Sequence, residues 1–311
     1  MGRIAFLFPG QGAQHVGMGK DLYQAEPAAR ALFDRADAQL GFALSKICFE
    51  GSEERLNATD VSQPAIFVHS AALLAVLGEK PAWKDVTPHT TAGLSLGEYT
   101  ALYAADAMDF DVALNLVAQR GRFMQEASKA QPSGMVSVLG LDEETVEQLC
   151  RTAANGQVLS PANFNCPGQI VISGHIEACQ RAVALAEEMG GRAIPLRVAG
   201  AFHTELMAPA ARKLAAVVAD SAIRMPRARV LANVTASAYE SVEQIRAGLV
   251  QQVTRPIRWQ QSMQKLLAEG EVAMYEIGPG RVLTGLMRKI ERRAVVVNLS
   301  TAEALAGQAG S

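Results

Sequence analysis

Cysteine is scarce in this sequence, and its spacing excludes two kinds of site. The 311 residues include four cysteines, Cys48, Cys150, Cys166 and Cys179, with no C-x-x-C pair. Four cysteines are too few for a disulfide framework, and their spacing does not match the ligands of a zinc site. We therefore expect reduced thiols and a cytoplasmic protein.

The sequence also lacks a charge excess and a membrane-spanning run. Its 29 Lys and Arg residues nearly balance 31 Asp and Glu residues, so no overall field favours nucleic acid or an anionic membrane. No stretch approaches the roughly 18 apolar residues of a spanning helix. The apolar run Ile4–Phe8 stops at Pro9-Gly10, which is too short for the core of a secretory signal. We expect neither a nucleic-acid nor a membrane partner.

Short apolar runs alternate with longer helical patterns, which predicts an α/β fold with a largely parallel sheet. Ile4–Phe8 and Thr90–Gly93 are typical of buried strands. Residues 62–78 have the continuous apolar character of a buried helix opened by Pro64. Asp109 is a good N-cap for the next helix.

The middle of the chain has a different pattern. Strands over 135–140, 158–163, 169–173 and 192–198 and helices over 142–154 and 176–189 follow one another in the order βαββαβ. This is the order of a ferredoxin-like unit. We therefore expect a small domain over residues 128–199, inserted into a larger domain made from residues 1–127 and 200–311.

The strongest local motif is Gly93-Leu94-Ser95-Leu96-Gly97, which fits the G-x-S-x-G nucleophile elbow between a strand and a helix. Such a turn exposes the serine above the sheet, and the amide that follows it lies at a helix N-terminus, where it can stabilise an oxyanion. An ordinary Gly-Ser turn would match the same five letters.

A serine nucleophile needs a base. Five histidines are available, and His69 lies in an apolar helix, where a core role is expected. His203 stands at a loop-to-helix junction after the predicted insertion, and a histidine that follows the serine in the chain suits hydrolase-like geometry. A surface or capping role for His203 remains open.

Arg120 is predicted to be buried, since it shares one face of its helix with the apolar residues Ala113, Leu116, Val117 and Met124. A buried guanidinium is costly without an anionic partner. That partner is either an internal Asp or Glu or the carboxylate of a substrate, bound bidentately.

The loop Gly10–Gln14 follows the first strand, at the edge of a parallel sheet where ligands bind. It is neither a G-x-G-x-x-G motif nor a Walker A loop, so nucleotide binding has little support. Its backbone N–H groups could supply a second oxyanion donor, although a plain glycine turn explains the loop equally well.

These pieces together resemble the malonyl-CoA:acyl carrier protein transacylases and the related acyltransferase domains of fatty-acid and polyketide synthases. The resemblance covers, in order, FPGQGAQ (Phe8–Gln14), GLSLGEY (Gly93–Tyr99), QRGRFMQ (Gln119–Gln125), NFNCPGQIVISG (Asn163–Gly174), GAFHTELM (Gly200–Met207), PIRW (Pro256–Trp259) and EIGPGRVL (Glu276–Leu283). It implies a hydrolase-like α/β domain with a ferredoxin-like insertion, the organisation already predicted above.

The resemblance also implies roles for individual residues. Ser95 would be the acylated nucleophile and His203 its general base, oriented by the backbone carbonyl of Gln252 in place of a triad acid. The backbone amides of Gln11 and Leu96 would form the oxyanion hole.

Three further residues would contact the substrate. Arg120 would bind the malonyl carboxylate, and Asn163 would border the cleft. Phe202, in the triplet Ala201–His203, resembles the malonyl-selecting members. One residue departs from the family, because Leu94 occupies the place of the histidine in its usual GHSLGE.

The implied reaction is ping-pong transfer of malonyl from malonyl-CoA to the phosphopantetheine thiol of acyl carrier protein, without metal or organic cofactor, in a protein expected to be a monomer. A serine thioesterase or esterase is the rival, and it would need a triad acid such as Asp142 or Glu177. A non-catalytic carrier-protein-binding module is the third reading, favoured only by Leu94. The basic cluster Arg288, Lys289, Arg292 and Arg293 is either a carrier docking surface or a solvated helix face.

Overall fold

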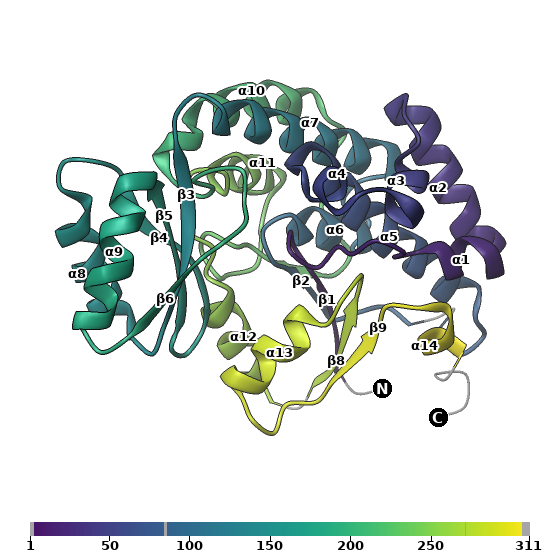
Figure 1. The fold of residues 1–311 in the computed structure, drawn as a ribbon. Helices are drawn as coiled ribbons and strands as arrows, with labels where there is room; N and C mark the ends of the chain where they lie inside the picture. The colour runs from purple at the N-terminus through teal and green to yellow at the C-terminus, as the bar shows by residue number, and fades with distance from the viewer. Residues whose placement is uncertain (1–2, 84–85, 271, 307–311) are drawn as a thin grey trace.

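The structure is a computed structural model that describes residues 3–83, 86–270 and 272–306. It contains two sheets, each with its own helices (Figure 1). The strands are β1 (Arg3–Phe8), β2 (Thr90–Gly93), β3 (Ser133–Leu139), β4 (Leu159–Cys166), β5 (Gln169–His175), β6 (Arg192–Pro195), β7 (Arg229–Leu231), β8 (Val272–Ile277) and β9 (Val296–Leu299).

The helices account for most of the remaining described residues. They are α1 (Lys20–Ala25), α2 (Pro27–Leu40), α3 (Leu44–Glu50), α4 (Glu53–Asn57), α5 (Thr59–Glu79), α6 (Gly97–Ala104), α7 (Phe110–Ser128), α8 (Glu143–Ala154), α9 (Ile176–Glu188), the short 3₁₀ helix η1 (Glu205–Met207), α10 (Ala208–Asp220), α11 (Val242–Gln251), α12 (Trp259–Ala268), α13 (Val282–Ile290) and α14 (Ala302–Ala306).

The larger sheet is parallel, with strand order β7-β2-β1-β8-β9, which confirms the predicted α/β class. Its central strand β1 sends alternate side chains to opposite faces. Phe6 and Phe8 join the cluster formed with α2, α5, α6 and α7, whereas Ala5 and Leu7 pack with α12 and α13. Both faces are therefore covered, as a parallel sheet requires.

Helix α5 differs from the prediction in two ways. It begins at Thr59, so Pro64 lies inside the helix and does not open it, and the Ala58 carbonyl accepts the N–H groups of Val61 and Ser62. By length and composition α5 could also cross a membrane, contrary to our reading of the sequence, but 83% of its most apolar window is buried inside the structure. It is a core helix, packed between α2 and α7.

Helix α7 confirms the buried stripe and corrects its cap. Arg120 is buried together with its apolar neighbours, and Arg122 is exposed on the other side. Asp109 occupies the N-cap position, but its side chain makes no capping hydrogen bond. It accepts instead from Arg224 Nη2 at 2.8 Å, because this cation competes for the carboxylate.

The smaller sheet is antiparallel, in the order β4-β5-β3-β6, with α8 and α9 packed against it. This is the strand order of a ferredoxin-like unit and confirms that part of the fold prediction. The boundaries 128–199 stay a prediction. Strand β4 also forms backbone hydrogen bonds with the segment just before α12: Phe164 N donates to Ile257 O, and Ile257 N donates to Ala162 O.

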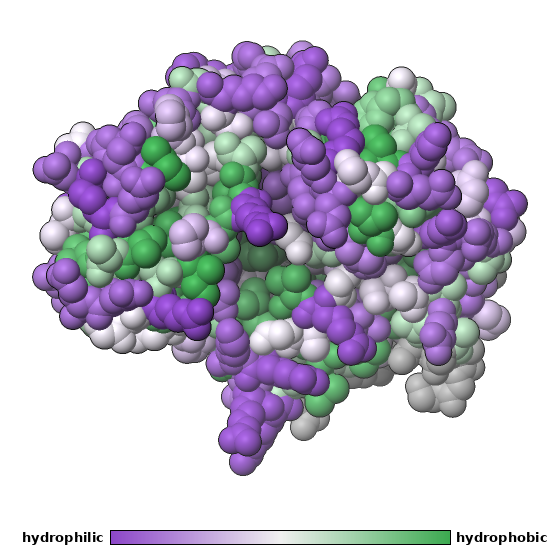
Figure 2. All heavy atoms as spheres, in the orientation of Figure 1, coloured by the Kyte–Doolittle hydropathy of each residue, from purple (hydrophilic) through white to green (hydrophobic). Residues whose placement is uncertain are grey.

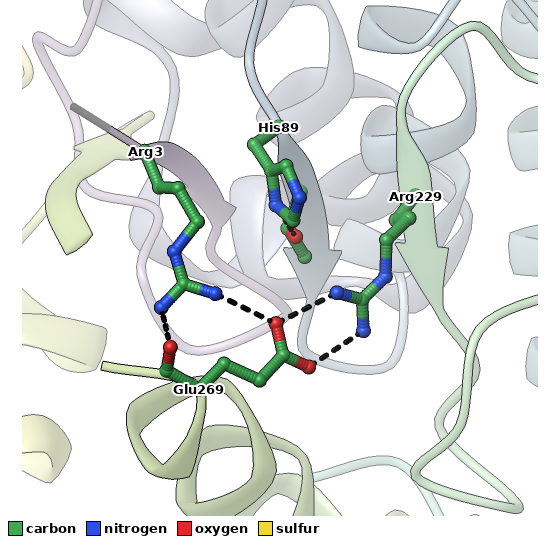
Figure 3. A network of polar contacts seen from close by, with 5 residues as sticks. Arg3, His89, Arg229 and Glu269 are labelled. Carbon is green, nitrogen blue, oxygen red and sulfur yellow. Dashed lines mark hydrogen bonds and ion pairs between the residues drawn. The ribbon is translucent and has the colours of Figure 1, made fainter. Parts of the chain in front are cut away.

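A charged cluster connects strands of the large sheet at their N-terminal ends (Figure 3). The Glu269 carboxylate accepts two hydrogen bonds from Arg229, at 2.7 and 2.8 Å, and one from Arg3 at 3.1 Å. The His89 side chain lies between the two arginines, and the His89 backbone N–H donates to Ile4 O. Glu269 thus links β1 and β7 to the end of α12, at the edge opposite the candidate site.

We predict that Glu269→Gln lowers the free energy of unfolding by about 1 kcal/mol at pH 7, the upper range for partly exposed pairs. Arg229 and Arg3 hold the pKa of Glu269 below its ordinary value. The ionised carboxylate therefore contributes stability above the unfolded pKa of about 4.3, and that contribution is lost as the pH falls through the lower folded value.

Urea unfolding at pH 7 and pH 3 tests this prediction. Glu50→Gln is the matched control, since Glu50 makes one exposed contact with Lys20. An E269Q deficit that is no larger than the control's, or that persists unchanged at pH 3, would contradict it.

Candidate active site

Loops that follow three neighbouring strands meet at one point of the large sheet. Gln11 follows β1, Ser95 follows β2 and Asn233 follows β7. The strands are parallel and adjacent, so their carboxyl ends lie together, which is where ligands bind in open α/β sheets.

The turn at Ser95 is a strained elbow whose glycines are required by close packing. Ser95 has a left-handed φ of 53°, uncommon for a residue with a side chain. A Cβ on Gly93 would lie 1.9 Å from the Gly97 backbone, and a Cβ on Gly97 would lie 2.1 Å from Phe8 O. Gly10 packs against the elbow just as closely, since a Cβ on Gly10 would lie 2.4 Å from Leu94 O. The sequence motif is therefore a real elbow.

Ser95, His203 and Gln252 form one hydrogen-bonded chain. Ser95 Oγ lies 2.9 Å from His203 Nε2, and His203 Nδ1 lies 2.7 Å from the Gln252 carbonyl oxygen. A carbonyl can only accept, so Nδ1 carries the proton and Nε2 faces the serine as the acceptor. His203 also has a positive φ, of 62°, and is buried.

The surroundings of His203 keep it neutral. Burial and the nearby positive charge of Arg120 lower its pKa to about 3, although the Gln252 carbonyl acts in the opposite direction. The neutral imidazole directs Nε2 at Ser95 Oγ, which is the position of a general base for the serine proton.

Arg120 reaches the same serine from helix α7. Its Nη2 donates to Ser95 Oγ at 3.0 Å and to Gln252 Oε1 at 2.8 Å, and its Nη1 donates to Gln63 Oε1 at 2.7 Å. Its guanidinium also lies 5.5 Å from the ring centroid of Tyr99. In the described part of the chain no carboxylate forms an ion pair with it, so the predicted internal Asp or Glu contact is not found there.

A cleft of about 350 Å³ opens onto Ser95, His203 and Arg120. Figure 2 shows the drawn face hollowed between the small sheet and the large domain. Asn163 and Phe202 line the cleft as predicted, together with Leu94, Asn165 and Arg197. Leu94 is nearly buried and packs with the apolar cluster beneath the sheet, so it contributes an apolar wall.

The two predicted oxyanion donors stand beside the serine. Leu96 follows Ser95 directly, and Gln11 lines the cleft above the elbow. Among the described residues neither backbone N–H donates to a protein acceptor. Both amides are thus available to a ligand.

Several residues of the site were missed by the sequence analysis. Asn233 accepts from Ser95 N at 2.7 Å through Oδ1 and donates to Gly93 O at 2.7 Å through Nδ2. Glu98 is fully buried one helical turn after Ser95 and contacts Gln252. Both lie where a strand or elbow ends, and a polar residue at such an end is the signal that could have found them.

The alternative candidates lie elsewhere. Asp142 caps α8 by accepting from Thr145 N at 2.8 Å, and Glu177 accepts from Gln157 at 3.3 Å, both on the exposed surface of the small sheet's helices. His69 is buried as expected, but within the described residues neither of its ring nitrogens has a hydrogen-bond partner, so it is not a satisfied core histidine.

Comparison with known proteins identifies the family. The acyl transferase domain model matches residues 5–307. A malonyl CoA-acyl carrier protein transacylase of Bacillus subtilis is 45% identical over 98% of this chain and 96% of its own length. The chain belongs to the acyl transferase domain family.

Solved acyl transferases have the same fold. The malonyl CoA-acyl carrier protein transacylase of Coxiella burnetii superposes with a TM-score of 0.94 at 36% identity, covering 99% of this chain and 97% of its own. A malonyl-transacylase solved in complex with a type II PKS acyl-carrier protein superposes with a TM-score of 0.93 at 40% identity, covering 98% of both chains. The resemblance drawn from the seven sequence motifs is confirmed.

Proposed function

We propose that this acyl transferase moves malonyl groups from malonyl-CoA to the phosphopantetheine thiol of acyl carrier protein, through a malonyl ester on Ser95. The reaction supplies fatty-acid or polyketide chain elongation. One observation carries the proposal: Ser95 Oγ lies within hydrogen-bonding distance of a neutral histidine and of a buried arginine, at 2.9 and 3.0 Å. The first contact activates a nucleophile, and the second places a cation beside the acyl group.

In the first half-reaction Ser95 Oγ attacks the thioester carbonyl as His203 Nε2 takes its proton. The amides of Gln11 and Leu96 stabilise the tetrahedral oxyanion, and each such donor contributes about 2.7–4 kcal/mol in related sites. The C–S bond then breaks, coenzyme A leaves with the proton held by His203, and malonyl remains on the serine.

In the second half-reaction the chemistry runs in reverse with a new thiol. His203 takes the proton of the phosphopantetheine thiol, whose sulfur attacks the malonyl ester. Collapse of the second tetrahedral intermediate breaks the C–O bond and returns the proton to Ser95. Gln252 keeps His203 in one tautomer throughout, because its carbonyl accepts the Nδ1 proton.

Arg120 supports the malonyl selectivity. Its Nε has no protein partner among the described residues, and Nη2 donates only to neutral oxygens. A free carboxylate is the anion that a buried guanidinium binds bidentately. Phe202 and Asn163 line the acyl side of the cleft. The apolar Leu94 stands in the elbow where the family has histidine, and it leaves Ser95 and the two glycines of the turn unchanged.

The thioesterase alternative has less support. A serine esterase would orient its base with an acid, but His203 faces a backbone carbonyl, and the two acids proposed from the sequence cap or cover surface helices. A buried arginine at the nucleophile has no purpose in a simple esterase. We also propose a cytoplasmic location, which the four buried, unpaired cysteines support. That the protein is a monomer stays a prediction.

The first test is intact-protein mass spectrometry after mixing with malonyl-CoA. We expect a malonyl adduct that maps to Ser95, moves to added acyl carrier protein and is absent from Ser95→Ala. An adduct that is released as malonate in buffer as fast as with the carrier would indicate a thioesterase. The absence of any adduct on the wild-type protein would refute acyl transfer.

Arg120→Ala should slow malonylation of Ser95 by about 10- to 100-fold, the effect of losing a hydrogen-bonded charge partner. Acetylation from acetyl-CoA should fall far less, because acetyl has no carboxylate. Arg122→Ala, on the exposed face of the same helix, is the matched control. Equal losses for malonyl and acetyl transfer would rule out the carboxylate contact.

A basic surface beside the cleft supports carrier docking. Leu286 of α13 lines the cleft, and Lys289, one turn later, donates to Gln169 on the cleft wall at 2.9 Å. The exposed Arg288, Arg292 and Arg293 continue this surface, and none of the three forms an ion pair within the described residues. Figure 2 shows hydrophilic side chains projecting below the hollow, where Figure 1 places α13 and the turn after it.

We predict that Arg292→Glu with Arg293→Glu raises the KM for acyl carrier protein severalfold and makes it less sensitive to salt, since surface charges mainly steer association. Malonylation by malonyl-CoA alone should keep its rate. Lys46→Glu with Arg212→Glu is the control for net charge, since both residues are exposed outside this surface and the pair changes the charge by the same amount. An unchanged KM for the carrier would show that the cluster is a solvated helix face.

A further inference from the structure

Glu98 is a buried carboxylate that the reaction scheme does not use. It is fully buried on α6, one turn after the nucleophile. Its Oε1 accepts from Tyr239 Oη at 2.6 Å and from Asn233 N at 3.1 Å, and its Oε2 accepts from Gln252 Nε2. Three donors on one buried carboxylate form a fully hydrogen-bonded network, the kind that fixes geometry.

The two residues that Glu98 holds are the ones that position the reacting groups. Gln252 orients His203 through its carbonyl, holds Arg120 through Oε1 and donates to Ser95 O at 2.9 Å. Asn233 accepts the Ser95 N–H. The contacts that Gln252 and Asn233 make with the elbow and with His203 therefore lie within two hydrogen bonds of Glu98.

Glu98 also balances a charge. Arg120 is buried, and its hydrogen-bond partners are neutral. The Gln252 side-chain amide lies between them, with its oxygen toward Arg120 and its nitrogen toward Glu98. The other fully buried carboxylate of the described residues, Glu276, accepts the amides at the start of α13. Of these two buried carboxylates, Glu98 is thus the one that a single residue, Gln252, links to the buried Arg120.

We propose that Glu98 is a positioning residue which, through the Gln252 amide, serves as the counter-charge of Arg120 and competes with the malonyl carboxylate for it. The inference rests on the proposed function. It implies that the resting site is neutral when Glu98 is ionised, and that a bound malonyl group then adds a second negative charge beside Glu98.

The competition should depend on pH, because Glu98 is the group in this cluster that titrates near neutrality. Burial raises its pKa to about 7, despite hydrogen bonds from Tyr239, Asn233 and Gln252 and the charge of Arg120. The other groups facing it do not titrate there. Burial raises the pKa values of Tyr99 and Tyr239 further above 10, and the pKa of His203 is about 3.

Single-turnover acylation of Ser95 by malonyl-CoA and by acetyl-CoA tests the proposal in Glu98→Gln. The maximal rate should fall about 10- to 100-fold for both acyl groups, because an amide cannot accept from all three donors and Gln252 loses its anchor. The half-saturating concentration for malonyl-CoA, divided by that for acetyl-CoA, should fall severalfold at pH 8, because Arg120 no longer has a competing anion.

Tyr239→Phe is the matched control. It removes one donor from the same carboxylate but leaves the Gln252 contact in place. Because the Tyr239 hydrogen bond lowers the pKa of Glu98, its loss should move the pH-dependent rise of the malonyl-to-acetyl ratio to higher pH, and the ratio should reach the wild-type value once Glu98 is ionised. In the double variant with Arg120→Ala, E98Q should no longer change this ratio, because the effects of mutations within one hydrogen-bond network are not additive. A wild-type ratio in E98Q, or the same ratio change with and without Arg120, would overturn the proposal.

A second test uses the wild-type protein alone, so its outcome does not depend on whether a variant folds. Protonation of Glu98 removes the competing charge, so the malonyl-to-acetyl ratio of half-saturating concentrations should rise as the pH increases from 6 to 8. A ratio that stays flat would overturn the proposal. If the wild-type protein forms no malonyl–Ser95 at all, the proposed function fails instead, and mass spectrometry distinguishes the two failures.

Discussion

The active site depends on the position of one neutral side chain, Gln252. Its backbone carbonyl sets the tautomer of His203, its amide oxygen holds Arg120, and its amide nitrogen reaches both Ser95 O and Glu98. A carboxylate at this position would pair with the arginine and compete with an acidic substrate. The amide can accept from a cation and donate to an anion at once, so it separates the two buried charges while forming a hydrogen bond with each.

The sheet explains why such a constellation can be precise. The nucleophile, the Gln11 amide and Asn233 lie at the ends of three adjacent parallel strands, whose register is fixed by backbone hydrogen bonds. The strained φ of Ser95 persists because the packing around it leaves no room to relax: Gly93 and Gly97 are in backbone contact, and Asn233 bonds to both sides of the elbow. Strain of this kind is maintained by the fold and used by the site.

Much of this was predictable from the sequence, and the exceptions have physical reasons. The elbow, the buried face of Arg120 and the βαββαβ order depend on local spacing, which the sequence displays directly. The start of α5 was misplaced because Pro64 suits a helix start, whereas tertiary packing tolerates it inside a buried helix. The Asp109 cap failed because Arg224, far away in the chain, takes the carboxylate. Glu98 and Asn233 were missed because their importance lies in contacts between residues more than 130 positions apart.

The same long-range contacts connect selectivity to the nucleophile. Arg120 donates to Ser95 Oγ and to Gln252, so the group that we propose binds the acyl carboxylate also contacts the proposed nucleophile and the residue whose carbonyl contacts His203. When an anion takes over the guanidinium, the serine loses one donor and its oxygen becomes freer to attack. An acyl group without a carboxylate leaves that hydrogen bond in place, and the nucleophile stays partly restrained. If Arg120 binds the malonyl carboxylate as proposed, we expect selectivity in the chemical step as well as in binding, and the chemical step is where differential stabilisation is most effective.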